Sequence, residues 1–246
     1  MDGLDVVLLI GGGLAAGIVN TMAGGGSLLT VPLLVLAGVP GNSANGSNRV
    51  GVLSQSLSAA ATFRGLGVAG LSGVGRILGP AVAGSLIGSI GVSQLTDDTF
   101  ERIFGLVMIP VLVISLRRPD AERLSSRPRW SPGVTTMVFF AIGVYGGAIQ
   151  AGVGLLLIAA LSRSGVDLVV ANSIKVIVVF VFTVFALPVF VINGQVDWDP
   201  ALVLALGLAA GGWVGAHVTV AGGEKVVRPV LAVAVVALAG RLVGLY

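Results

Sequence analysis

Glycine-rich stretches at two places in the chain carry backbone groups that could bind an anion. Gly24, Gly25 and Gly26 interrupt one apolar run, and Gly152 and Gly154 interrupt another, at an offset of 128 (Gly24 to Gly152). Glycine leaves backbone N–H groups uncovered and lets a second group approach closely. Successive N–H groups at a helix N-terminus attract anions through directed donors and partial positive charge. We interpret each stretch as a break in a membrane segment and as half of an anion site. The alternative is a glycine-rich seam for helix packing.

Two cations accompany these breaks. Arg49 and Lys175 each follow an Ala-Asn pair at the start of a long apolar segment. A charged side chain inside a membrane is costly and usually functional; the alternative is that both side chains snorkel to the interface. Positive charges suit an anion, whereas a cation carrier should show carboxylates. No Asp or Glu falls well inside an apolar segment, so the sequence argues against a proton relay through carboxylates.

Small polar side chains near the breaks and the cations complete the predicted site. Ser27 follows the first glycine stretch and also fits a simple N-cap role. The predicted substrate-binding residues are Asn20, Gly24, Gly25, Gly26, Ser27, Asn45, Ser47, Arg49, Gln150, Gly152, Gly154, Asn172, Ser173 and Lys175.

An intramembrane enzyme is the competing class of protein. Ser27 or Ser47 paired with His217, the only histidine, is the one combination that could form a catalytic dyad. The sequence has no Gly-x-Ser-x-Gly elbow, no His-Glu-x-x-His motif and no cluster of metal ligands. We therefore predict no catalytic residue, no metal and no cofactor, and we assign His217 to an interfacial or packing role.

The composition places these residues in a membrane protein. Of the 246 residues, 55% are hydrophobic and 10% are charged, whereas soluble domains carry about 25% charged residues. The absence of cysteine excludes disulfides and thiol catalysis. The basic residues gather in one membrane-flanking loop, so the pI of about 10.0 does not indicate a nucleic-acid partner. The predicted partners are the lipid bilayer and a small anion.

The apolar segments predict the helices. They run over 4–22, 27–37, 46–63, 72–92 and 99–116, and then over 133–150, 153–163, 170–192, 200–217 and 226–243. A helix needs about 20 residues to cross a bilayer, or about 17 at minimum. Segments 27–37 and 153–163 are too short, so each pairs with the segment before it as a bent or re-entrant hairpin.

The chain also repeats itself. Residues 23–29 align with residues 151–157 at an offset of 128, and Ala44-Asn45 aligns with Ala171-Asn172 at 127. Each half crosses the membrane an odd number of times, so the halves are inverted, as in secondary transporters that bind substrate near the midplane. We predict an all-α integral membrane protein of two inverted-topology repeats, residues 1–116 and 132–246, joined by a basic linker at 117–131. Each repeat holds a glycine-broken or re-entrant helical hairpin and three transmembrane helices.

Charge in the linker predicts the orientation. Its five arginines (117, 118, 123, 127 and 129) outnumber Asp120 and Glu122. By the positive-inside rule the 117–131 loop is cytoplasmic and both termini are extracytoplasmic, in a multi-pass protein of the cell membrane.

Further glycines recur at helical spacing. Gly207, Gly211 and Gly215 lie four residues apart, and the pairs Gly75 with Gly79 and Gly84 with Gly88 have the same spacing. This spacing predicts close helix packing, either within the chain or in a homodimer.

Three motifs carry a family resemblance. The run Gly-Gly-Gly-Ser-Leu-Leu-Thr-Val-Pro-Leu-Leu at 24–34, Gly-Val-Pro at 38–40 and Ala-Asn-Gly-Ser-Asn-Arg at 44–49 resemble the sulfite exporter TauE/SafE family. The second copy departs from this pattern, with Val153 for the middle glycine and no proline that matches Pro32. The resemblance implies a transporter of small sulfur-containing anions such as sulfite or organosulfonates.

Together these observations predict a secondary transporter that alternates access around a midplane site between the two repeats. An anion-selective channel lined by the same glycine-loop donors is the alternative. The sequence leaves open which anion is carried, in which direction, and what drives it.

Overall fold

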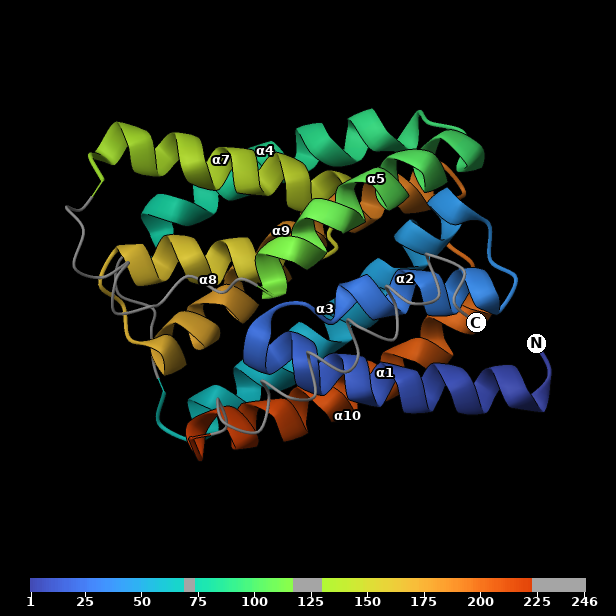
Figure 1. Cartoon of the computed structure of the whole chain (residues 1–246), viewed down its shortest axis with the longest axis horizontal. Coiled ribbons are helices and arrows are strands. Elements are labelled where there is room, and N and C mark those ends of the chain that lie inside the picture. Colours follow the sequence, from blue (N-terminus) through green and yellow to red (C-terminus); the bar gives the residue numbers. More distant parts are fainter. Residues whose placement is uncertain (69–73, 117–129, 223–246) are drawn as a thin grey trace.

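The computed structural model describes residues 1–68, 74–116 and 130–222, and every regular element in these ranges is an α-helix (Figure 1). The helices are α1 (Gly3–Ala23), α2 (Ser27–Leu36), α3 (Gly41–Gly65), α4 (Gly75–Ser93), α5 (Asp97–Leu116), α7 (Pro132–Ala148), α8 (Val153–Arg163), α9 (Leu168–Ile192) and α10 (Trp198–Val220). The predicted all-α class is confirmed. Most of the linker predicted at 117–131 and the segment predicted at 226–243 lie outside the described residues.

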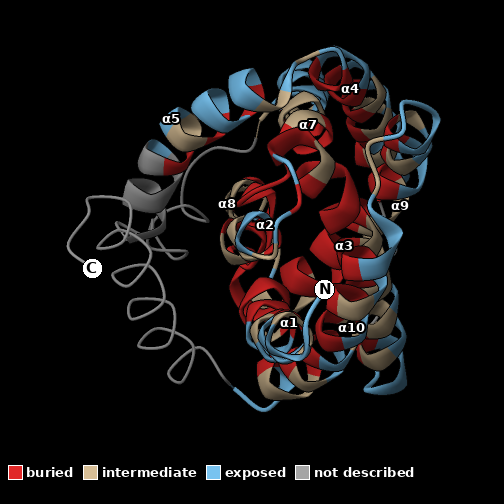
Figure 2. Ribbon diagram, turned by 90° about the vertical axis from the view of Figure 1, so that its right-hand side faces the viewer, coloured by how far each residue is buried: buried red, intermediate tan, exposed pale blue. Residues whose placement is uncertain are grey.

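Apart from α5, the described helices form three layers (Figures 1 and 2). Helices α4 and α7 pack together as one outer layer, and α1 and α10 as the other. Helices α2, α3, α8 and α9 lie between them, where buried residues concentrate (Figure 2). Each outer pair therefore joins a helix from the first half of the chain to a helix from the second half.

Glycines let the outer pairs approach closely. A Cβ on Gly207 or Gly211 would collide with a backbone carbonyl of α1, and one on Gly84 or Gly88 would collide with a carbonyl of α7. These glycine faces are therefore filled within the chain, which is one of the two arrangements that the sequence predicted. In contrast, Gly75 and Gly79 have nothing within 4 Å of an added Cβ.

Among the helices of the described ranges, four are long and apolar enough to cross a membrane: α1, α4, α9 and α10. Helices α2 and α8, with 10 and 11 residues, are too short, as the sequence predicted. Helix α3 has 25 residues, but its many polar side chains keep it below the apolarity of a typical span. It begins at Gly41 instead of near residue 46, because the polar stretch before Arg49 is helical and buried against other helices.

The two predicted breaks are confirmed. Helix α1 ends at Ala23, and Gly24 has the left-handed φ of 83° that favours glycine. Between α7 and α8, Gly152 has a φ of 72° and Gln150 a φ of 61°. A non-glycine residue in this region is uncommon and often marks a functional site. The breaks touch each other, since a Cβ on Gly154 would lie 2.9 Å from the carbonyl oxygen of Gly24.

Candidate functional site

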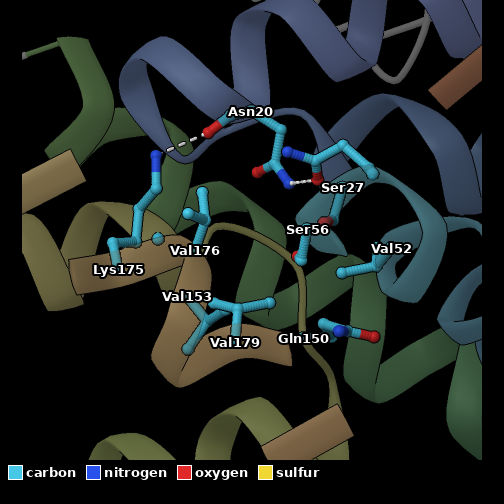
Figure 3. A pocket seen from close by; sticks show the side chains of 11 residues that line it. Asn20, Ser27, Val52, Ser56, Gln150, Val153, Lys175, Val176 and Val179 are labelled. Carbon is cyan, nitrogen blue, oxygen red and sulfur yellow. Dashed lines mark hydrogen bonds between the residues drawn. The ribbon is translucent and has the colours of Figure 1, made fainter. Parts of the chain in front are cut away.

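A cavity lies where the two breaks meet helices α3 and α9 (Figure 3). It leaves about 10 Å³ for the centre of a water molecule, which is room for about one water. All of its lining residues are buried: Asn20, Ser27, Val52, Gln55, Ser56, Gln150, Val153, Gly154, Lys175, Val176 and Val179. Both halves of the chain contribute to this lining.

Lys175 supplies the positive charge of the cavity. Its side chain is 2% exposed, and Nζ donates to the carbonyl oxygens of Asn20 and Thr21 and to Oδ1 of Asn172, each at 2.7 Å. An ammonium has three donors, so all of them are used. The two carbonyls belong to the last turn of α1, where the helix dipole favours a cation. Lys175 therefore stabilises the end of α1 and leaves its charge at the cavity wall.

Arg49 lies outside the cavity lining. It is fully buried; its terminal nitrogens donate to the carbonyls of Gly146 (3.2 Å) and Gly147 (2.5 Å), with a longer contact to that of Ala148 (3.3 Å). Its guanidinium also stacks 4.3 Å from the centre of the Phe190 ring. Arg49 thus caps the end of α7 as Lys175 caps the end of α1. Because both cations are buried, the alternative that they snorkel to the interface is wrong.

Four other predicted residues hold elements together and do not line the cavity. Asn45 donates to the carbonyl of Ala148 at 2.9 Å, and Asn172 orients Lys175. The hydroxyl oxygen of Ser47 accepts from the backbone N–H of Asp197, with an N···O distance of 2.8 Å. Ser173 donates to the carbonyl of Val68 at 3.3 Å. The two serines therefore attach loops of the opposite half, which is a structural role.

The backbone amides of the two breaks also differ in whether they are bonded and in whether they line the cavity. In the ranges that the structure describes, no acceptor faces the amides of Gly25, Gly26, Gly152 or Gly154, whereas the amide of Gly24 donates to Asn20 at 2.8 Å. Only Gly154 among these glycines lines the cavity. Of the predicted site residues, the cavity brings together Asn20, Ser27, Gln150, Gly154 and Lys175.

Sequence reasoning missed two polar residues of the lining. Gln55 accepts from Asn20 at 2.6 Å and donates to Thr21 at 2.7 Å, which joins α3 to the end of α1. Ser56 lies beside it, 1% exposed, and its hydroxyl has no hydrogen-bond partner among the described residues. The signal was the run Ser54-Gln55-Ser56 inside the apolar segment 46–63, since polar side chains at membrane depth need partners.

Gln150 is held from α9. Its Nε2 donates to the hydroxyl of Thr183 at 3.1 Å, while its buried Oε1 has no partner in the described part of the chain. A threonine hydroxyl can accept or donate, so turning the amide over would keep this bond and leave Nε2 free instead. In either orientation Gln150 has one unpaired polar end at the cavity.

Comparisons with known proteins agree with this membrane architecture. The family model described as sulfite exporter TauE/SafE matches residues 9–242. The chain is 27% identical over 229 residues to "Probable membrane transporter protein ORF9" of Sinorhizobium sp, covering 92% of this chain and 88% of that protein. It is 24% identical to "Probable membrane transporter protein" of Haemophilus influenzae, covering 94% and 92%. It is also 24% identical to "Probable membrane transporter protein YfcA" of Escherichia coli K12, covering 92% and 85%. No solved structure matches. These names describe transporters and not enzymes, as the sequence predicted.

Proposed function

Because the chain belongs to the sulfite exporter TauE/SafE family, we propose that this membrane transporter carries small sulfur-containing anions, such as sulfite or a short sulfonate, by secondary transport. The observation that carries this proposal is the buried cavity with Lys175 in its wall and unpaired polar groups around it. A buried cation at membrane depth is costly unless function or pairing retains it. Here Lys175 donates only to neutral acceptors, and the described lining holds no carboxylate, which suits an anion.

We further propose that the halves are inverted repeats that alternate access to this cavity. The support for this is that each half makes the same kinds of contact with the other half. Helix α1 packs on α10 and α7 packs on α4. Arg49 of the first half caps α7, and Lys175 of the second half caps α1. A twofold relation between halves requires such reciprocal contacts, and a site between repeats is typical of secondary transporters.

The proposed orientation keeps the 117–131 loop in the cytoplasm and both termini outside. Its support is the arginine excess in that loop. Cysteines introduced at Ser125 and Asp2 are expected to label from opposite sides of intact cells. Labelling from the same side would overturn the inverted arrangement.

The channel alternative requires a continuous wet pore. Every residue of the cavity lining is buried, and the free space holds about one water molecule. This closed arrangement favours a carrier that must rearrange to admit its substrate.

Flux into proteoliposomes tests the proposal. We expect uptake of sulfite or a short sulfonate above that of protein-free vesicles, and accumulation that an uncoupler abolishes. Flux that persists down the gradient but never concentrates the anion would favour a channel. No flux of sulfite, sulfate, thiosulfate or short sulfonates would contradict the proposed substrate class.

A further inference from the structure

We infer that the cavity selects singly charged oxyanions, such as bisulfite or a sulfonate, over doubly charged ones, such as sulfate. The inference rests on the proposed function, and it assigns the charge of the substrate from the charges around the cavity. Lys175 is the one ionisable side chain in the described lining.

The neighbouring charges do not add a second cation to the lining. Arg49 on α3 is the other buried cation of the described residues, but its terminal nitrogens donate to the carbonyls that end α7 and its guanidinium lies over the Phe190 ring. Tyr145 on α7 donates its hydroxyl to the carbonyl of Ala151. From α1, α2, α3, α8 and α9 the described lining is otherwise neutral. The part of the lining that the structure describes therefore holds one cation, the ammonium of Lys175.

Helix ends change this balance only in part. The C-termini of α1, which Lys175 caps, and of α7, just before Gln150, carry partial negative charges, and the N-termini of α2 at Ser27 and of α8 at Gly154 carry partial positive ones. These partial charges oppose each other. A monoanion therefore nearly neutralises the site, whereas a dianion leaves about one negative charge without a partner in a poorly hydrated space.

The groups that can form hydrogen bonds to a ligand in the cavity are uncharged. Lys175 has no free N–H, so it attracts the ligand by charge alone. Direct contacts fall to the hydroxyls of Ser27 and Ser56, the free end of Gln150 and the amide of Gly154. A hydroxyl and an amide side chain can donate to an anionic oxygen and can also accept from a protonated one. Neutral donors are weaker than charged ones, so they replace the tightly held water of a dianion poorly.

Anion binding to the purified full-length protein tests the inference. The probes are methanesulfonate, a monoanion at every pH used, and sulfate, a dianion at every pH used. Sulfite is measured at several pH values on both sides of its conversion from bisulfite to the dianion. Ligand-dependent thermal stabilisation gives the affinities, and competition against sulfite flux gives an independent measure. We expect sulfate to bind at least roughly tenfold more weakly than methanesulfonate, since one unpaired charge is costly at this depth.

The pH series distinguishes titration of the ligand from titration of a group of the protein. The affinity for sulfite should fall in step with the bisulfite fraction, while that for methanesulfonate stays level over the same range. A parallel loss for both would mean that a group of the protein titrates, which would overturn the inference. Equal or tighter binding of sulfate would overturn it as well and leave the proposed function standing. Binding of none of these anions would contradict the proposed function itself.

A second cation in the lining offers a further check. Ser56→Lys is expected to reduce the preference for methanesulfonate over sulfate by at least roughly tenfold. Thr62→Lys on the same helix, away from the lining, is the matched control and should leave the preference unchanged. An unchanged preference in a folded Ser56→Lys protein would contradict the charge argument, and the wild-type series decides the question if that variant does not fold.

Discussion

Lys175 and Arg49 are buried cations near the starts of equivalent long helices, yet they differ in what surrounds them. Both donate to the carbonyls that end a broken helix of the opposite half. Arg49 is surrounded by α7 and the Phe190 ring, whereas Lys175 forms part of the cavity wall. The same arrangement, a cation at a helix C-terminus, therefore serves assembly in both halves, and under the proposed function Lys175 also contributes to substrate binding.

Arg49→Ala should give the largest loss of stability. It leaves buried carbonyls of α7 without donors and removes the contact with Phe190. We expect a loss of about 2–3 kcal/mol in the free energy of unfolding, measured by thermal unfolding in detergent. Arg49→Lys should recover only part of it, because lysine cannot supply the fork of donors. Full stability in Arg49→Ala would mean that the cap at α7 contributes nothing.

Gly154→Ala should cost about 1–3 kcal/mol through overpacking. Its Cβ would press on the backbone of Gly24, so the two breaks would have to separate. Because Gly154 also lines the cavity, sulfite affinity should fall together with stability. A Gly154→Ala protein with wild-type stability and affinity would show that the breaks need not touch.

Much of the difference between Arg49 and Lys175 could not be predicted from the sequence. The breaks were predictable, because glycine clusters inside apolar runs permit positive φ and leave short helices after them. The separate roles of Arg49 and Lys175 were not, since each depends on carbonyls about 97 and 155 positions away. Gln55 and Ser56 were missed because hydropathy does not say which face of α3 meets a cavity. The early start of α3 was missed because Asn42 and Asn45 are buried and donate to carbonyls of α4 and α7 instead of to water.

Thr183→Val tests the support of Gln150 at the cavity. Valine has the shape of threonine but cannot bond Nε2 of Gln150, so we expect a loss of about 1 kcal/mol. The loss should appear in sulfite affinity as well as stability. Thr219→Val is the matched control, because its hydroxyl bonds only the carbonyl of Gly215 within α10. Equal effects on affinity from the two variants would remove Gln150 from the site.

Gly91→Ala should have the smallest effect, and in the opposite direction. An added Cβ at this helical position meets nothing within 4 Å, and alanine favours a helix over glycine by up to about 1 kcal/mol. Unchanged or slightly raised thermal stability is expected, with sulfite affinity unaltered. A clear loss would show that this open face of α4 is covered in the native membrane.

The most direct test compares Lys175→Gln with Arg49→Gln in one flux assay. Glutamine keeps neutral donors near the helix ends and removes the charge in each case, and Arg64→Ala serves as an exposed-cation control. Sulfite flux into proteoliposomes is measured per folded protein. The account predicts a loss of about 10- to 100-fold in Lys175→Gln, equivalent to about 1.4–2.8 kcal/mol. It predicts near wild-type flux per folded protein in Arg49→Gln and Arg64→Ala. Wild-type flux in Lys175→Gln, or an equal loss in Arg49→Gln, would contradict the assignment of the substrate site to the Lys175 cavity.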